Sequence, residues 1–199
     1  MLCTACREDL PLTRFHDDPQ NRVEQLFFGR ARLSAASAFL LFNRSGIAQR
    51  MLHRLKYKGD LDVGIELGRM MAQDLAGSKR FTGIDALLAV PLHPSRQRQR
   101  GYNQSQVIVE GMQQIMGLPQ LDEGLFRSVR TSSQTKRGRL ARWMNVKEVF
   151  QVAEPEKLRD RHVLLVDDVV TTGATIESCA LALQKVPGIH ISVYTAACA

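Results

Sequence analysis

The stretch that decides the fold runs from His162 to Thr175 and reads His-Val-Leu-Leu-Val-Asp-Asp-Val-Val-Thr-Thr-Gly-Ala-Thr. Its apolar run, Val163 to Val166, is typical of a strand that is buried on both faces of a sheet. Two adjacent carboxylates follow, then a turn of small and hydroxyl-bearing residues, and a helix is expected from about Ala174. The order of strand, acid pair, turn and helix predicts an α/β protein with a mainly parallel central sheet flanked by helices.

The turn after this strand has the chemistry of a sugar-phosphate site. At the C-terminal end of a parallel strand, it lies where open α/β sheets bind their ligands. The hydroxyls of Thr171, Thr172 and Thr175, with backbone N–H groups at the helix start, suit a phosphate. Ionised Asp167 and Asp168 only accept hydrogen bonds, so they suit sugar hydroxyls or a hydrated metal ion.

Length and composition favour one globular domain with a small appendage. The chain has 199 residues, of which 44% are hydrophobic, so it can form a core. We expect an N-terminal appendage over residues 1–33 and the main domain over residues 34–199. No apolar run approaches the ~18 residues of a membrane span, and the N-terminus lacks the apolar run of a secretory signal. The sequence therefore predicts a cytoplasmic protein without a membrane span.

The positive charge of the chain is concentrated in one segment. The net charge is +7, and residues 94–142 hold nine Lys/Arg against three Asp/Glu, a net of +6. Such a cluster favours an anionic partner, which could be pyrophosphate, a nucleotide or nucleic acid. The alternative is a basic face that contacts only water.

The cysteines fall into two kinds. Cys3 and Cys6 form a Cys-x-x-Cys pair, which is half of a zinc ribbon, whereas a tetrahedral site needs two more ligands. His16 could supply one of them. A zinc site at Cys3 and Cys6 is therefore one hypothesis, beside two surface thiols or the remnant of a lost site. Cys179 and Cys198 lie in apolar surroundings, and we expect them to be core thiols.

Hydrophobic periodicity places the other elements. Strands are expected over 35–42, 84–90, 149–152 and 191–196. Helices are expected over 47–58, 61–75 and 174–186, and from a cap at Asn103 or Ser105 to about residue 116. Residues 121–129 are expected to form a short strand or a turn of helix, and residues 154–160 a charged connector.

Between the strand at 84–90 and the next helix, the chain has an unusual composition. Pro91 and Pro94 exclude a continued helix or central strand, so the chain must leave the sheet there. Arg96, Arg98 and Arg100 follow at alternate positions before a glycine, and could wrap an anion. His93 is a lone histidine, for which a structural role or a loop contact is favoured over catalysis.

The run from Val163 to Thr175 resembles the phosphoribosyl pyrophosphate (PRPP) signature of type I phosphoribosyltransferases. The resemblance implies that Asp167 and Asp168 hold the ribose 2′- and 3′-hydroxyls of PRPP bound with Mg²⁺. It also implies that a loop wraps the 5-phosphate, and that this loop consists of Thr171, Thr172, Gly173, Ala174 and Thr175. A receiver-type acid pair is the competing interpretation, but it does not require the Thr-Thr-Gly-Ala-Thr turn.

A narrower resemblance, to the ComF family, covers the chain from about residue 35 to its end. Three runs carry it, namely His53-Arg-Leu-Lys-Tyr-Lys-Gly59, Val90-Pro-Leu-His-Pro94 and Arg98-Gln-Arg-Gly-Tyr-Asn-Gln-Ser105. The segment 131–145, with Gln134 and Arg139, resembles the mobile loop of that family. The resemblance implies a pyrophosphate site, to which we assign Leu92, His93, Arg98 and Arg100. ComF-like proteins usually begin with a four-cysteine zinc finger, of which this chain has only Cys3 and Cys6.

The resemblance also implies a function. The family is linked to DNA uptake in natural competence, and its fold is that of phosphoribosyltransferases. We therefore predict Mg²⁺-dependent PRPP binding and phosphoribosyl transfer to an acceptor that the sequence does not identify, either a base or an amine. The alternative is a PRPP- or nucleotide-sensing protein, or an accessory that binds single-stranded DNA. No cysteine stands at position 1 or 2, so a self-contained amidotransferase is not expected. A homodimer or a complex with the competence machinery stays open.

Overall fold

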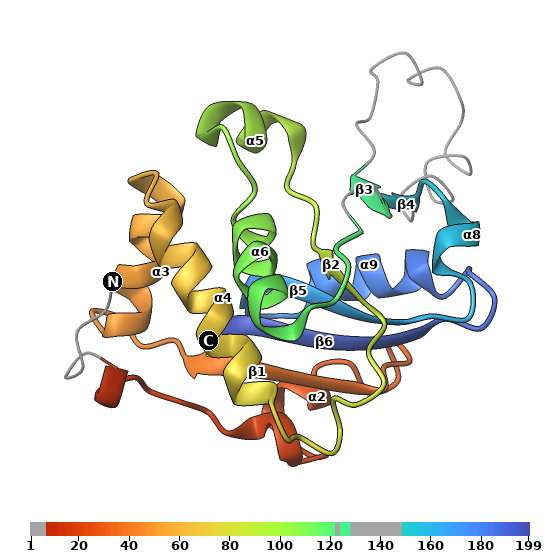
Figure 1. Ribbon diagram of the computed structural model, residues 1–199, viewed down its shortest axis with the longest axis horizontal. Coiled ribbons are helices and arrows are strands. Elements are labelled where there is room, and N and C mark those ends of the chain that lie inside the picture. The colour runs from red at the N-terminus through yellow and green to blue at the C-terminus, as the bar shows by residue number, and fades with distance from the viewer. Residues whose placement is uncertain (1–6, 122–123, 128–148) are drawn as a thin grey trace, which may run out of the picture.

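The core of the protein is a parallel sheet of four strands in the order β1-β6-β5-β2. It is seen in a computed structural model that describes residues 7–121, 124–127 and 149–199 (Figure 1). The strands are β1 (Ala35–Leu41), β2 (Ala86–Ala89), β5 (His162–Val170) and β6 (His190–Cys198). The predicted α/β class, with a central parallel sheet flanked by helices, is confirmed.

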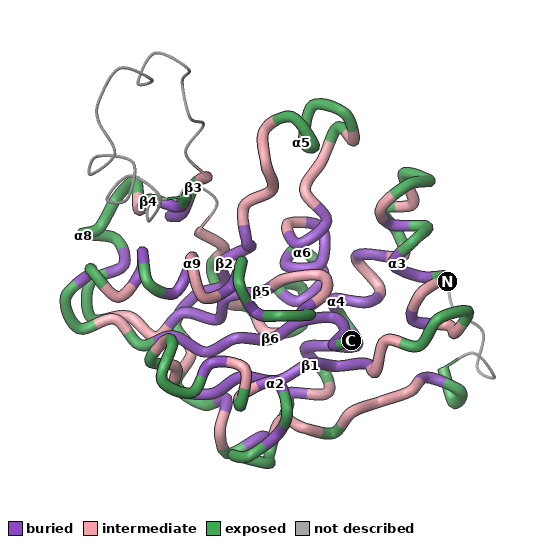
Figure 2. Tube along the Cα trace, turned by 180° about the vertical axis from the view of Figure 1, so that it is seen from behind, coloured by how far each residue is buried: buried purple, intermediate pink, exposed green. Residues whose placement is uncertain are grey.

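Helices cover both faces of this sheet. One face packs against α3 (Ile47–Tyr57), α4 (Leu61–Leu75) and α6 (Gln104–Met116), and the other against α2 (Arg22–Gln25) and α9 (Ala174–Leu183). Along β5 the side chains alternate between the two apolar clusters: Leu164 and Val166 join the first, Val163 and Leu165 the second. All four are buried, and the sheet is the most continuously buried part of the trace in Figure 2.

The remaining elements are short. A 3₁₀ turn, η1 (Phe15–Asp17), precedes α2, and α5 (Pro94–Arg100) stands away from the sheet between β2 and α6 (Figure 1). β3 (Leu125–Arg127) and β4 (Phe150–Val152) form a separate antiparallel pair, and α8 (Pro155–Leu158) leads into β5.

Two glycines bring α4 and α6 into close contact. A Cβ on Gly68 would lie 2.0 Å from the carbonyl oxygen of Ile108, and a Cβ on Gly111 would lie 2.1 Å from that of Ile65. Only glycine permits this backbone approach. The pair of helices then packs as one layer, and α6 contacts both β5 and β2.

The connections create a topological switch point at β2 and β5, and the region outside the carboxyl ends of these two strands is called the crevice below. These strands are neighbours, yet the helix after β2 (α6) covers one face of the sheet and the helix after β5 (α9) covers the other. The chain segments that leave the two strands therefore diverge at their carboxyl ends. In open α/β sheets this topological switch point is where ligands bind.

Residues 7–33 pack against β1, and residues 10–13 run along the outer edge of this strand. Leu12 bridges Leu40 in antiparallel orientation, and the N–H of Thr13 donates to the carbonyl of Phe39 at 2.9 Å. These contacts cover a strand edge that would otherwise offer free backbone groups.

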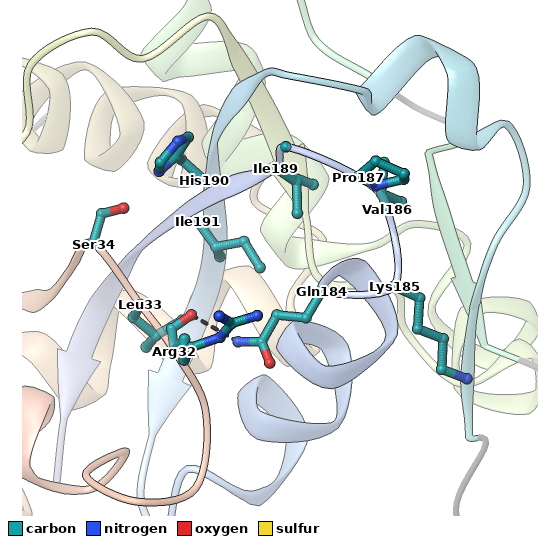
Figure 3. Close-up of a pocket in the computed structure, with 11 residues that line it drawn as sticks. Arg32, Leu33, Ser34, Gln184, Lys185, Val186, Pro187, Ile189, His190 and Ile191 are labelled. Atoms are coloured by element: carbon teal, nitrogen blue, oxygen red, sulfur yellow. Dashed lines mark hydrogen bonds between the residues drawn. The ribbon is translucent and has the colours of Figure 1, made fainter.

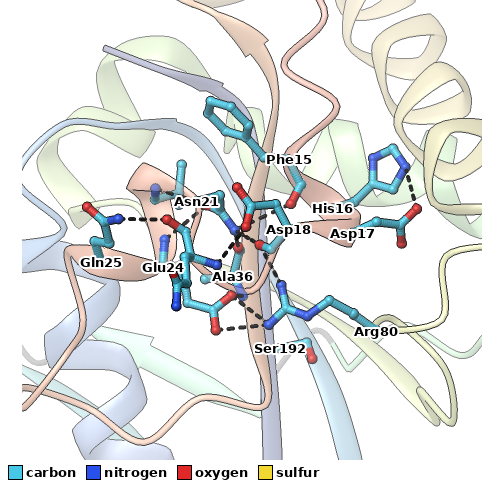
Figure 4. Close-up of polar contacts among 12 residues, drawn as sticks. Phe15, His16, Asp17, Asp18, Asn21, Glu24, Gln25, Ala36, Arg80 and Ser192 are labelled. Carbon is cyan, nitrogen blue, oxygen red and sulfur yellow. Dashed lines mark hydrogen bonds and ion pairs between the residues drawn. The ribbon is translucent and has the colours of Figure 1, made fainter.

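Side chains hold the same segment from inside (Figure 4). The buried Asn21 amide donates to the carbonyl of Ala36 at 2.9 Å, while its oxygen accepts from the first turn of α2. Arg80 pairs with Glu24 at 2.8 Å. The segment is thus bonded both to β1 and to the chain that precedes β2.

The structure confirms most of the predicted elements and corrects three. The segment around the arginines is a helix, α5, because Pro94 occupies its first position, where a proline has no hydrogen bond to lose. The connector 154–160 contains the short helix α8. Strand β5 continues through the acid pair to Val170 and does not end at Val166.

Two further predictions concern the core and the membrane. Cys179 and Cys198 are buried free thiols, as expected. No helix in the described part of the chain has the length and apolarity of a membrane span.

Candidate functional site

The acid pair lies in the last part of β5, beyond the point where β2 ends. Ala89, the last residue of β2, pairs with Val166, whereas Asp167 and Asp168 follow beyond the end of β2. The strand continues because Asp167 is in register with Thr195 of β6. Both carboxylates therefore border the crevice at the switch point.

Asp167 accepts hydrogen bonds from two described neighbours. The hydroxyl of Ser105, at the start of α6, donates to its Oδ1 at 2.9 Å, and the N–H of Asp168 donates to the same atom at 2.8 Å. Burial, and next the negative charge of Asp168, raise the pKa of Asp167 to about 7. These hydrogen bonds and the ammonium of Lys56 act in the opposite direction. Ionisation of Asp167 is therefore less favourable than that of an ordinary aspartate.

Asp168 has a cationic partner from a distant helix. The Nζ of Lys56, in the last turn of α3, lies 2.8 Å from Oδ2 of Asp168. The two side chains are 23% and 16% exposed, so the pair is largely removed from solvent. Lys56 belongs to the run 53–59, for which the sequence offered a resemblance but no role.

The predicted phosphate loop follows β5 directly and opens α9. Thr171, Thr172, Ala174 and Thr175 are exposed, whereas Gly173 is buried. Asp167 and residues 169–176 line a hollow of about 50 Å³. With hydroxyls around it and the N-terminus of α9 beside it, this hollow has the donors that a phosphate requires.

Gly173 is required by the shape of the loop. Its φ of 77° lies in the left-handed region, and a Cβ there would be 2.9 Å from Cε1 of Phe27. Arg30 supports the loop from the same side, because it donates to the carbonyl of Thr172 at 3.1 Å and pairs with Glu177 of α9. No signal in the sequence pointed to Phe27 or Arg30, since both lie in the segment assigned to an appendage.

The chain after β2 meets the acid pair at the crevice. The N–H of Val90 donates to the carbonyl of Val166 at 2.9 Å, and the amide of Asn103 donates to the carbonyl of Val90 at the same distance. Leu92 and His93 follow at once and are partly exposed. Nδ1 of His93 accepts from the N–H of Ser95 and caps α5, so this histidine has the structural role that the sequence favoured.

The arginines of the predicted pyrophosphate site do not share one face. In a helix with about 100° per residue, Arg96 and Arg100 lie on one side of α5 and Arg98 on the opposite side. Arg100 donates to Gln104 at 2.7 Å, and its guanidinium lies 5.3 Å from the centre of the Tyr57 ring. The three arginines therefore do not share one face of α5, and their role in binding pyrophosphate stays a prediction.

Some predicted residues lie outside the described part of the chain. These are Gln134 and Arg139 of the loop, and Cys3 and Cys6 of the zinc hypothesis. Within the described residues, no three His, Cys, Asp or Glu side chains are grouped around a common metal position. The zinc site and the mobile loop stay predictions.

A larger hollow lies at the opposite end of the sheet (Figure 3). It has a volume of about 550 Å³ and lies between the start of β1 and the connection from α9 to β6. Gln184 spans it by donating to the carbonyl of Arg32 at 2.7 Å. Its walls combine apolar side chains such as Ile189 and Ile191 with the exposed Lys185.

Fold and site together define an open α/β protein whose acid pair and hydroxyl-rich loop meet at a switch point. Its sequence is 28% identical over 147 residues to the DNA utilization protein YhgH of Escherichia coli O157:H7, covering 72% of this chain and 64% of the relative. It is 29% identical over 148 residues to Competence protein F of Haemophilus influenzae, with coverages of 72% and 65%. The predicted resemblance to competence proteins is confirmed at this level. The aligned region spans slightly less than two thirds of each relative.

No family model matches the chain. Among solved structures, the glutamine PRPP amidotransferase from B. subtilis has a TM-score of 0.45 and 18% identity, and covers 65% of this chain and 25% of that protein.

Proposed function

We propose that the protein binds PRPP at the crevice between β2 and β5 and transfers its phosphoribosyl group to a base or an amine. One observation carries this proposal: the acid pair, the hydroxyl loop and the chain after β2 converge at one switch point. Asp167 and Asp168 accept hydrogen bonds from the ribose hydroxyls, and the loop from Thr171 to Thr175 holds the 5-phosphate. The names of the relatives support a link to DNA uptake.

Magnesium fits this proposal as a companion of the ligand. Mg²⁺ usually keeps several waters and takes one or two carboxylates together with substrate phosphates. Asp167 and Asp168 can supply those carboxylates, and the described residues offer no three-ligand site of their own. The ion would neutralise charge on the departing pyrophosphate.

The protein's own groups act by binding and placement. The acceptor attacks C1 of the ribose, and the electron pair of the C1–O bond leaves with pyrophosphate. Leu92 and His93 follow Val90, whose N–H donates to the residue before the acid pair, and we assign the binding of that leaving group to their backbone N–H groups. No protein nucleophile is required.

Calorimetry with PRPP and Mg²⁺ tests the binding step. The wild type should bind, and Asp168→Asn should weaken binding about 10- to 100-fold, because a charged acceptor is lost. Asp160→Asn is the matched control: Asp160 is exposed, lies before β5 at the other end of the strand, and has a φ of 56° that Asn tolerates. Equal affinity of wild type and Asp168→Asn, or no binding by the wild type, contradicts the proposal. Release of pyrophosphate with candidate bases then tests transfer.

A second candidate function, binding of single-stranded DNA, is favoured by an aromatic surface beside the site. Tyr57 is 67% exposed, and Arg100 stacks against its ring. Exposed aromatic rings next to guanidinium groups stack with the bases of single strands.

Tyr57→Ala should lower the affinity for an oligonucleotide about tenfold. A mobility-shift assay across salt concentrations measures this, and Phe28→Ala is the control, since Phe28 is 60% exposed. DNA binding should weaken steeply with salt, whereas PRPP binding should change less. Unchanged affinity in Tyr57→Ala argues against a DNA-binding surface at this place.

A further inference from the structure

We propose that Lys56 binds the pyrophosphate group of the ligand: its ammonium pairs with Asp168 in the free protein and moves to the phosphate oxygens when PRPP binds. This inference rests on the proposed function and assigns a residue to it. It starts from the contact of 2.8 Å between Nζ of Lys56 and Oδ2 of Asp168. This contact brings α3, an element outside the PRPP signature, to the acid pair.

The fold holds the last turn of α3 against the chain that follows β2. The hydroxyl of Tyr102 donates to the carbonyl of Leu55, and Arg100 lies over the ring of Tyr57. Lys56 is therefore flanked by two residues that contact the segment 100–102, while its own side chain reaches Asp168. Directly after this segment, the amide of Asn103 donates to the carbonyl of Val90 at the end of β2. Lys56 thus approaches the crevice from the side to which we assign pyrophosphate.

Charge explains why the ammonium should move. With both carboxylates ionised and Lys56 protonated, these three groups have a net charge of −1, which repels a polyanion. Once the ribose hydroxyls occupy the carboxylates, the ammonium can exchange one carboxylate oxygen for the more highly charged pyrophosphate. A lysine suits this task because three donors sit on a flexible four-carbon stem. Its side chain keeps 23% of its surface exposed, so the protein does not fully enclose it.

The alternative is that Lys56 serves only as a counter-ion that keeps the acid pair ionised. In that case its loss would weaken binding of the ribose end, which the carboxylates hold, at least as much as binding of the pyrophosphate end. Ribose 5-phosphate contains the first end without the second, and inorganic pyrophosphate contains the second without the first. Binding of these two probes therefore separates the two roles.

Calorimetry with PRPP, inorganic pyrophosphate and ribose 5-phosphate, each with Mg²⁺, provides the test. Lys56→Met should lose about tenfold or more in affinity for PRPP and pyrophosphate, because a charged hydrogen bond is removed. Its affinity for ribose 5-phosphate should stay within about twofold of the wild type. Lys56→Arg, which keeps the charge, should recover most of the loss. Lys58→Met removes the same charge from an exposed position two residues away and should bind like the wild type.

Each result decides the inference. Equal losses for all three probes, or no loss, overturn the role of Lys56, and a melting curve for each variant confirms that it is folded. Failure of the proposed function looks different: the wild type would bind neither PRPP nor ribose 5-phosphate. Inorganic pyrophosphate then still decides, since binding that Lys56→Met removes supports the inference and absence of binding overturns it.

Discussion

The two ends of the parallel sheet differ in the chemistry that the helices present there. At the carboxyl end, α9 begins beside the loop from Thr171 to Thr175, so its N–H groups and the positive end of its dipole face the hollow. At the amino end, α9 has ended, and the carbonyl end of the helix dipole lies beside the larger hollow at Gln184. The larger hollow has a volume of about 550 Å³, and the hollow at the loop has a volume of about 50 Å³. The smaller space is nevertheless the one to which we assign the phosphate, because dipole and donors converge on it.

The ends also differ in how their side chains are used. At the carboxyl end, Asp167 and Asp168 are held by Ser105 from α6 and by Lys56 from α3, so three elements meet. At the amino end, Gln184 simply ties α9 to the chain before β1. Convergence of charged groups from several elements, rather than volume, identifies the site.

Each end of the sheet has a glycine at which one added methyl group tests the difference between the two ends. Gly173 and Gly188 have φ values of 77° and 71°, so alanine is strained at both. A Cβ on Gly173 would meet the ring of Phe27, and one on Gly188 would meet the carboxylate of Asp160. Both variants should melt several degrees below the wild type. Only Gly173→Ala should also bind PRPP about 100-fold more weakly, because the displaced loop loses its phosphate contacts.

Melting curves and calorimetry on the two alanine variants measure this difference. Gly188→Ala controls for the general effect of a strained backbone at a turn. If both variants lost affinity equally, the two ends of the sheet would be coupled, and the separation between them would be wrong.

The sequence predicted the strand, the turn and the helix start of the proposed phosphate loop well, because the signals for them are local. An apolar run, two carboxylates and a Thr-Thr-Gly-Ala-Thr turn define a strand, a turn and a helix start within 14 residues. The order β1-β6-β5-β2 and the switch point depend on pairings between distant segments, for which hydrophobic periodicity has no signal. The extension of β5 to Val170 has the same origin, since polar residues continue a strand when a neighbour such as β6 supplies the hydrogen bonds.

The missed contacts show the same limit. Lys56 and Ser105 lie in runs that were singled out, but their role depends on a fold that joins α3, α6 and β5. Arg30 and Phe27 support the phosphate loop from a segment more than 140 residues away in the chain, as the separation of Arg30 and Thr172 shows. The helix α5 was missed for a local reason: Pro94 was taken to exclude a helix, whereas at the first position it favours one.

The pH dependence of ligand binding is a second test of the difference between the two ends of the sheet, with a smaller expected effect. Because the pKa of Asp167 is raised to about 7, the ionised form that accepts ribose hydroxyls is lost as pH falls below 7. Affinity for PRPP should therefore rise about tenfold per pH unit up to pH 7 and then level off. Ser105→Ala removes a hydrogen bond that favours the ionised form, so it should move the midpoint to higher pH.

The stability of the free protein should change in the opposite direction. The folded state holds a proton on Asp167 that the unfolded chain releases near pH 4, so this group lowers stability as pH rises from about 4 to 7. At the amino end, burial lowers the pKa of His162. This group therefore lowers the stability of the folded protein as the pH falls below the ordinary pKa of a histidine. The two effects oppose each other in melting curves, whereas binding reports the carboxyl end alone. Asp167→Asn corrects for titration of the ligand phosphates, and a midpoint that persists in this variant would assign the pH dependence to the ligand.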